Sequence, residues 1–155
     1  MEDTNMDTRS DVSNDQVQPT SKILIFKATE LPEQYKAIIY AKYLRTLRSG
    51  NDFYKLIDNE PYYQVQAAYL GTLITRPAAE VRLAVLTDDP DTVVGWALLE
   101  PNKLHYVWVA KDGRKDGMMN FLLQNHTFTA FSHLTKSWMS IWHSKYPTVK
   151  FNPYC

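Results

Sequence analysis

Residues 104–124, LHYVWVAKDGRKDGMMNFLLQ, contain a strand-like run, a polar loop and a helix-like run in succession. The run at 104–110 is rich in β-branched and aromatic side chains, which favour strands. Residues 111–117 are polar and include two glycines, which is typical of a loop. The helix-like residues that follow would connect two strands as a crossover. We therefore expect residues 127–131 to form a strand parallel to 104–110.

The loop itself predicts an anion site. The first N–H groups of a helix lack intrahelical partners, and the helix dipole adds partial positive charge there. Gly117 would let a ligand approach the backbone closely, and Arg114 and Lys115 add full positive charges. This combination fits a pyrophosphate better than a single phosphate. It matches neither a Walker loop nor a dinucleotide fingerprint, and a charged turn that only connects strand to helix is the alternative.

The rest of the chain predicts one mixed α/β domain. An antiparallel hairpin is indicated by the turn residues Asp88-Asp89-Pro90-Asp91 between two apolar runs. We expect one buried face on each long helix: Ala37, Tyr40, Leu44 and Leu47 in the first, and Tyr62, Val65, Tyr69 and Leu73 in the second. The expected strands are 23–26, 81–86, 92–100, 104–110, 127–131 and 148–152, and the expected helices are 32–49, 60–75, 118–124 and 136–145.

Length and composition divide the chain into a tail and a domain. Its 155 residues correspond to about one domain. Residues 1–22 hold five acidic and two basic side chains and very few apolar ones, so they cannot bury enough surface to fold alone. We predict a polar acidic tail at 1–22 and a single domain at 23–155. A homo-oligomer or a larger assembly is the kind of partner that would order the tail.

Charge and cysteine content narrow the class of protein. The 17 basic and 17 acidic residues balance and form no basic block, which disfavours nucleic acid as a partner. No apolar run is long enough to span a bilayer, and residues 1–15 lack the apolar core of a secretory signal. The single cysteine, Cys155, allows no intramolecular disulfide. We expect a cytoplasmic protein that binds no membrane and, since its His and Cys spacings match no ligand pattern, no metal.

The order of elements around 104–124 resembles the GNAT superfamily of N-acetyltransferases. In that family three antiparallel strands precede a loop of the type Arg/Gln-x-x-Gly-x-Gly/Ala and a helix, and in this chain the loop is Arg114-Lys115-Asp116-Gly117-Met118-Met119. The resemblance covers about residues 23–152. It implies a mixed, mostly antiparallel sheet with splayed central strands, flanked by helices. Residues 145–154 also look like compact acetyltransferase-like proteins encoded by tailed phages.

The resemblance implies an acetyl-CoA-dependent N-acetyltransferase in which a primary amine, on a small molecule or a protein, attacks the thioester directly. Catalysis then requires positioning, one base and one acid. The Val109 N–H would be the oxyanion donor on the exposed edge of the fourth strand. The implied acetyl-CoA-binding residues are Val107, Trp108, Val109, Arg114, Lys115, Asp116, Gly117, Met118 and Met119.

Three residues are candidates for the proton transfers. Glu100 ends the third strand and would act as a base through water. His105 begins the fourth strand, and the near-neutral pKa of an ordinary histidine would suit proton abstraction. Strand alternation would place His105 on one face with Val107 and Val109. Tyr146 is the tyrosine nearest to the family's usual acid position. For each, a structural role is the alternative: a solvated carboxylate, a half-buried histidine and a packing tyrosine.

The loop 51–59 would form the wall of the acceptor site. There Phe53 and Tyr54 would stack on the acceptor, and Asp52 would pair with a cationic amine. The alternative function is a non-catalytic structural or interaction protein on the same scaffold, such as a component of a phage particle, which would place it in a virion. Met119 at the family's small position and Trp142-His143 near the acid position favour this alternative.

Overall fold

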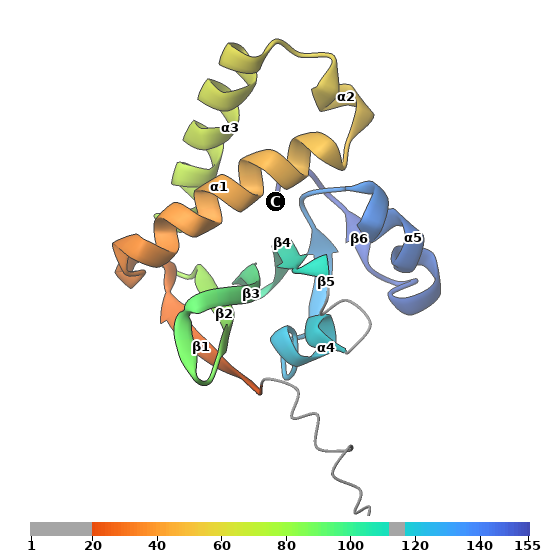
Figure 1. Cartoon of the computed structure of the whole chain (residues 1–155). Helices are drawn as coiled ribbons and strands as arrows, with labels where there is room; N and C mark the ends of the chain where they lie inside the picture. The colour runs from red at the N-terminus through yellow and green to blue at the C-terminus, as the bar shows by residue number, and fades with distance from the viewer. Residues whose placement is uncertain (1–19, 112–116) are drawn as a thin grey trace, which may run out of the picture.

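The computed structural model describes residues 20–111 and 117–155. Over these residues one six-stranded sheet has its strands in sequence order (Figure 1). The strands are β1 (Ser21–Lys27), β2 (Glu80–Leu86), β3 (Asp89–Glu100), β4 (Asn102–Val109), β5 (Phe128–Phe131) and β6 (Lys150–Phe151). The helices are α1 (Glu33–Ser49), α2 (Asp52–Lys55), α3 (Asn59–Ile74), α4 (Met118–Leu122) and α5 (Lys136–Lys145), with a short 3-10 turn η2 (Ala28–Glu30).

The pairing of the strands confirms the predicted fold class. Strands β1 to β4 pair antiparallel, whereas β4 pairs parallel with β5, and β5 with β6. The sheet is therefore mixed and mostly antiparallel, and the crossover through α4 is the one expected from residues 104–124. Strand β1 begins at Ser21, two residues inside the predicted tail, and residues 1–19 of that tail lie outside the described residues.

Helices cover both faces of the sheet. Helices α1 and α3 pack on one face around Leu83, Trp96 and Leu98, and α5 packs on the other face around Ala97, Leu104 and Phe131 (Figure 1). The buried residues of α1 are Tyr35, Ile39, Tyr43 and Leu47.

The predicted buried faces of the two long helices are partly wrong. In α1, Ala37 is exposed while Tyr40 and Leu44 lie at the margin of the core. In α3, Val65 is 62% exposed. Apolar and aromatic residues occupy a broad arc of α1, so helical spacing alone leaves the rotation of the helix about its axis undecided. Contact with the sheet selects the arc that is buried.

A β-bulge in β4 changes which way its side chains point. The register between β3 and β4 shifts between Leu98 and Leu99, opposite residues 104–106 of β4. Leu104 and Val107 consequently pack in the same cluster on the α5 side, although three positions separate them. The strict alternation predicted for this strand therefore fails at the bulge. His105 lies within it and points toward Glu100 and Ser132.

The two central strands diverge after a short parallel pairing. Strand β5 pairs with β4 only at Asn102, Lys103 and Leu104, and then the chain turns away toward α5. The remaining residues of β4, 105–109, run on without β5 beside them. This is the splayed pair of strands that the resemblance implies, and it opens the sheet toward α5.

Candidate functional site

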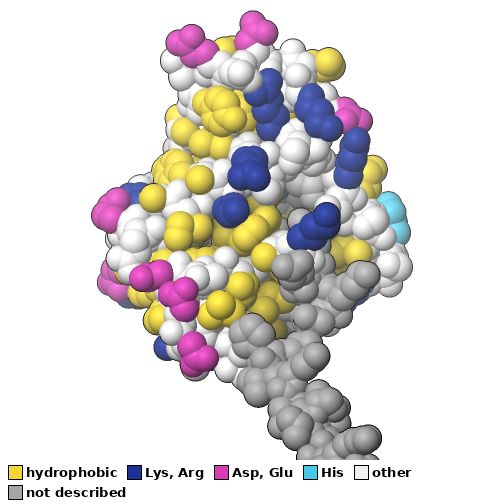
Figure 2. Space-filling view, viewed as in Figure 1, with side chains coloured by type: hydrophobic (Ala, Val, Ile, Leu, Met, Phe, Trp, Pro, Cys, Tyr) yellow, Lys and Arg dark blue, Asp and Glu magenta, His cyan; other side chains and the backbone are white. Residues whose placement is uncertain are grey.

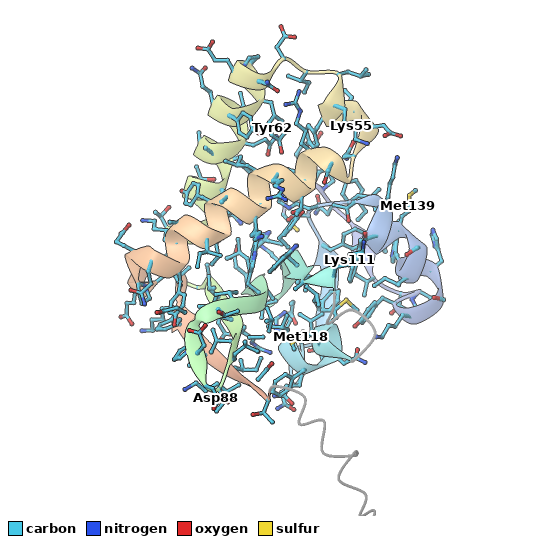
Figure 3. All side chains as sticks on the ribbon, in the orientation of Figure 1. Lys55, Tyr62, Asp88, Lys111, Met118 and Met139 are labelled. Atoms are coloured by element: carbon cyan, nitrogen blue, oxygen red, sulfur yellow. The ribbon has the colours of Figure 1, made fainter. Side chains whose placement is uncertain are left out.

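A cleft of about 660 Å³ follows the part of β4 that β5 does not cover. Residues 106–109 of β4 form one wall and α5 forms the other. Gly117, Met119 and Asn120 close one end beside α4, and the C-terminal end of α1 closes the other. In Figure 3, the labels of Met118 and Lys55 mark the regions of α4 and α2. The divergence of β4 and β5 is what creates this space.

The backbone of β4 presents hydrogen-bonding groups to the cleft. The Ala110 N–H donates to the Val94 carbonyl on the β3 side, at 2.8 Å. Successive residues of a strand direct their N–H and C=O groups to opposite edges, so those of Val107 point away from β3 and toward the cleft. A ligand with amide groups in an extended arm could pair there as an added strand does.

The cleft brings together five of the predicted acetyl-CoA-binding residues, which are Val107, Trp108, Val109, Gly117 and Met119. Met118 is not among its lining residues, because its side chain packs against β3 at Gly95. Arg114, Lys115 and Asp116 lie outside the described residues. The role of Val109 N–H as oxyanion donor stays a prediction.

Gly117 has a backbone conformation that suits glycine. It precedes α4 with a φ of 76°, in the left-handed region that side chains with a Cβ disfavour. A Cβ added there would meet no atom within 4 Å, so the position is open to the cleft. Helix α4 is a single short turn, five residues long, rather than the seven expected.

Glu100 is held by two hydrogen bonds to the same oxygen. Arg76 Nη1 lies 2.7 Å and His105 Nε2 lies 2.8 Å from its Oε1. Burial raises the pKa of Glu100, but the hydrogen bonds from Arg76 and His105 outweigh it and hold this pKa below its usual value. Glu100 is thus a paired carboxylate and does not line the cleft.

His105 belongs to a buried chain of side chains that reaches helix α1. Its Nδ1 lies 2.8 Å from Ser132 Oγ, which lies 2.8 Å from His133 Nδ1. His133 Nε2 in turn lies 2.8 Å from Tyr43 Oη. Sequence reasoning missed Ser132, His133 and Tyr43 in this role, because partners 27 and 90 positions apart leave no spacing signal.

A small pocket of about 20 Å³ shares lining residues with this chain and with the cleft. His105 and His133 line the pocket, and it shares Tyr106, Val107 and Trp138 with the larger cleft. The two predicted bases, Glu100 and His105, do not line the larger cleft, and His105 lines only the small pocket. Burial lowers the pKa of His105, and it lowers the pKa of His133 to about 4.

Tyr146, the predicted acid, lies away from the cleft. Its ring stacks on Trp138 at 5.4 Å and contacts Phe128 at 5.2 Å between ring centroids. Burial raises its pKa. The side chain lines neither the cleft nor the small pocket, so a catalytic role stays a prediction with no contact to support it.

The predicted acceptor residues are only partly brought to the cleft. Asp52 accepts hydrogen bonds from Lys136 at 2.9 Å and Lys55 at 3.4 Å, and these lower its pKa. Lys136 lines the cleft, so Asp52 lies at its rim, already paired. Phe53 is 66% exposed, while Tyr54 packs against Tyr62 in the space between α2 and α3.

The surface beside that rim is basic. A shallow hollow next to the cleft is lined by Arg45, Arg48 and Lys55, and the two hollows share Ser49. Figure 2 shows Lys and Arg side chains gathered over this part of the face.

Two further observations concern the residues that the structure describes. None of their helices is both long and apolar enough to cross a membrane, and they contain no group of His, Cys, Asp or Glu side chains placed to hold a metal ion.

Several of the solved structures that are similar to this chain at low identity are described as acetyltransferases. A putative acetyl transferase from Pyrococcus furiosus is 13% identical, with 84% of this chain and 80% of that chain covered and a TM-score of 0.46. Aminoglycoside 6′-N-acetyltransferase AAC(6′)-Ih from Acinetobacter baumannii is 13% identical, with 85% and 77% covered and a TM-score of 0.40. A match from Desulfovibrio desulfuricans is a putative acetyltransferase of the GNAT family.

YjaB from Escherichia coli, in its apo form, is 18% identical, with 68% of this chain covered and a TM-score of 0.44. This chain spans 63% of the length of YjaB. No family model matches the chain, and no curated protein matches it. These four similar proteins are bacterial or archaeal, so the resemblance to phage-encoded proteins is not borne out. The described residues have the mixed, mostly antiparallel sheet flanked by helices that the resemblance implies.

Proposed function

We propose that this chain binds acetyl-CoA in the cleft along β4 and transfers the acetyl group to an amine. The observation that carries the proposal is the cleft itself, about 660 Å³ along the strand edge that β5 leaves uncovered. Its volume lies within the range of about 300–1,000 Å³ typical of small-molecule sites. The backbone of Val107 would hold the amide groups of the pantetheine arm, and Lys145 would give positive charge near the α4 end.

Acetyl-CoA supplies the thioester carbonyl, and the chain would supply position and proton transfer. The amine nitrogen bonds to the carbonyl carbon, the carbon–sulfur bond breaks, and one proton leaves the nitrogen while the thiolate takes one up. Much of the rate increase in such a reaction comes from holding amine and carbonyl in contact. The cleft extends from Gly117 to the C-terminal end of α1, so both reactants could lie along β4.

Calorimetric titration with acetyl-CoA tests the proposal on a matched pair of variants. Gly117→Asp and Gly117→Asn carry side chains of nearly the same size, and both residues tolerate a positive φ better than most. We expect the parent to bind and the aspartate variant to lose about tenfold or more in affinity, because like charges repel. The asparagine variant should lose much less. Equal losses of affinity in the two variants would show that Gly117 does not lie at the phosphate site. No binding by the parent at millimolar acetyl-CoA would refute the proposed function.

Met119 supports a second candidate, a non-catalytic scaffold. Its side chain lines the cleft and packs against the clusters on both sides of α4, where the family has a small residue. Binding of acetyl-CoA by Met119→Gly, with none by the parent or by the size-matched Met119→Leu, would favour the scaffold. A cytoplasmic location belongs with the enzyme, and a virion location would belong with the scaffold.

A further inference from the structure

Five side chains beside the cleft form a continuous hydrogen-bonded chain across the core. They come from β3, β4, the segment after β5 and α1, and they are Glu100, His105, Ser132, His133 and Tyr43, with Gln66 of α3 beyond. Each neighbouring pair lies between 2.8 and 3.1 Å apart. Arg76 fixes the far end, since its Nη1 donates to Glu100 and to the Cys155 carbonyl.

The carboxylate of Glu100 sets the direction of the hydrogen bonds from His105 through Ser132 to His133. A carboxylate only accepts, so His105 Nε2–H donates to it and the Nδ1 of a neutral His105 must accept. The Ser132 hydroxyl then donates to His105 Nδ1, and Ser132 Oγ accepts from His133 Nδ1–H. This leaves the Nε2 of neutral His133 as an acceptor.

The Tyr43 hydroxyl can stop donating to His133 Nε2 and still donate a hydrogen bond, to Gln66. Its hydroxyl has one proton and two acceptors, His133 Nε2 at 2.8 Å and Gln66 Oε1 at 3.1 Å. When the proton turns to Gln66, His133 Nε2 is open to another donor. His133 is only partly buried and lines the small pocket, which shares Tyr106, Val107 and Trp138 with the cleft.

We propose that His133 Nε2 takes the proton of the acceptor amine and that Ser132 and His105 carry the charge to Glu100. The amine proton binds His133 Nε2, the Nδ1 proton of His133 passes to Ser132 Oγ, and the hydroxyl proton of Ser132 passes to His105 Nδ1. One proton thus leaves the amine, and His105 becomes an imidazolium beside a carboxylate. His133 would be the catalytic residue, while Ser132, His105 and Glu100 act through it. This inference rests on the proposed function.

The surroundings of the two histidines suit such a relay. The rings of Tyr43, Tyr69 and Tyr106 lie within 5.6 Å of the His133 ring, and burial raises the pKa of all three, so they stay neutral. The charged groups near His105 are Glu100, Arg76 and Lys103. A proton on His133 has no counter-ion at hand among the described residues, whereas one on His105 touches Glu100. The positive charge is therefore more stable on His105 than on His133.

Two measurements test the relay. Nitrogen NMR of the histidine rings in the parent protein should find His105 protonated at Nε2 and His133 at Nδ1, and the reverse tautomer of His133 would overturn the proposal whatever the chain binds. The second is thiol release from acetyl-CoA with methylamine as the acceptor probe. We expect Ser132→Ala and His133→Phe to lower kcat by about 100-fold, the size of a general-base contribution, with acetyl-CoA affinity unchanged.

Matched variants separate this role from a structural one. Ser132→Thr keeps the hydroxyl and should restore most of kcat, and His143→Phe makes the same change at an exposed histidine and should leave kcat as in the parent. Acetyl-CoA binding with unchanged kcat in Ser132→Ala would refute the relay and leave the proposed function standing. No acetyl-CoA binding by the parent would refute both.

Discussion

His133 illustrates how the fold sets the chemistry of one side chain. Three tyrosine rings surround it, and its ring nitrogens both have partners. Burial lowers its pKa to about 4, so at neutral pH it is an uncharged acceptor rather than a cation. A lone histidine in a sequence gives no sign of this state, because the desolvation comes from α1, α3 and β4 together.

The lowered pKa of His133 predicts a pH dependence of stability. Since the folded pKa of about 4 lies below the ordinary value of 6.5, the unfolded chain binds more protons between these values. The contribution of neutral His133 to the free energy of unfolding is fully present above pH 6.5. It is lost as the pH falls toward 4, by roughly 3 kcal/mol at most. Urea unfolding across this range should show a shallower loss for His133→Phe than for the parent. This assignment would be contradicted if the stability of His133→Phe fell with pH as steeply as that of the parent, or if the stability of the control His143→Phe fell less steeply.

Among the elements, α4 and β4 depend on close contact with β3. Gly95 of β3 pairs with Val109 of β4 and faces α4. A Cβ there would lie 3.0 Å from Leu122 Cδ1 and 3.1 Å from the Trp108 carbonyl oxygen. This carbonyl belongs to the backbone of β4 on the side of β3, so it cannot move without moving β4, which forms a wall of the cleft. The glycine thus lets α4 close one end of the cleft.

Replacing Gly95 should weaken the packing of α4 and β4 against β3. We expect Gly95→Ala to destabilise the protein by about 1–3 kcal/mol, the usual cost of overpacking. Gly71→Ala on α3 is the control, because its Cβ would meet only the end of the Tyr40 side chain, at 3.2 Å. Alanine is also the better helix former by about 1 kcal/mol. Chemical denaturation of both variants measures the difference, and equal stability of the two would show that β3 and α4 have room to adjust.

For the molecule as a whole, the first strand begins two residues before the predicted start of the domain. Strand β1 pairs with β2 from Ser21↔Leu86 to Lys27↔Glu80, and the Thr87 N–H donates to the Thr20 carbonyl at 2.9 Å. The predicted boundary between 22 and 23 would therefore cut through a strand. The apolar run at 23–26 marked the centre of the strand but not its polar start.

Two shortened chains test this boundary. A chain that begins at Thr20 keeps every pair of β1, so we expect its melting temperature to match that of the full chain. A chain that begins at Ile23 loses the pairs of Ser21 and Lys22 with β2 and should melt at a lower temperature. Equal melting of the two shortened chains would show that these pairs contribute nothing, and a large loss in the first would assign a structural role to the tail.

Local patterns in the sequence determined the order of elements and the mixed sheet. Helix α5 has the predicted bounds, since Thr135 caps it by accepting a hydrogen bond from the Trp138 N–H, a signal within four residues. The hairpin of β2 and β3 and the crossover to β5 follow from turn residues and from apolar runs in the same way. These signals act over a few positions and so can be read along the chain.

Only the tertiary structure decided how the side chains of distant elements meet. The bulge in β4 depends on its register with β3, and the buried arc of α1 depends on its contact with the sheet. The link between His105 and Tyr43 joins β4 to α1 through Ser132 and His133, and no spacing encodes it. The cleft exists because β5 leaves β4 after three paired positions. Register, helix rotation and strand divergence are set by packing among elements, and that is why no local pattern in the sequence indicated the hydrogen bonds among His105, Ser132, His133 and Tyr43.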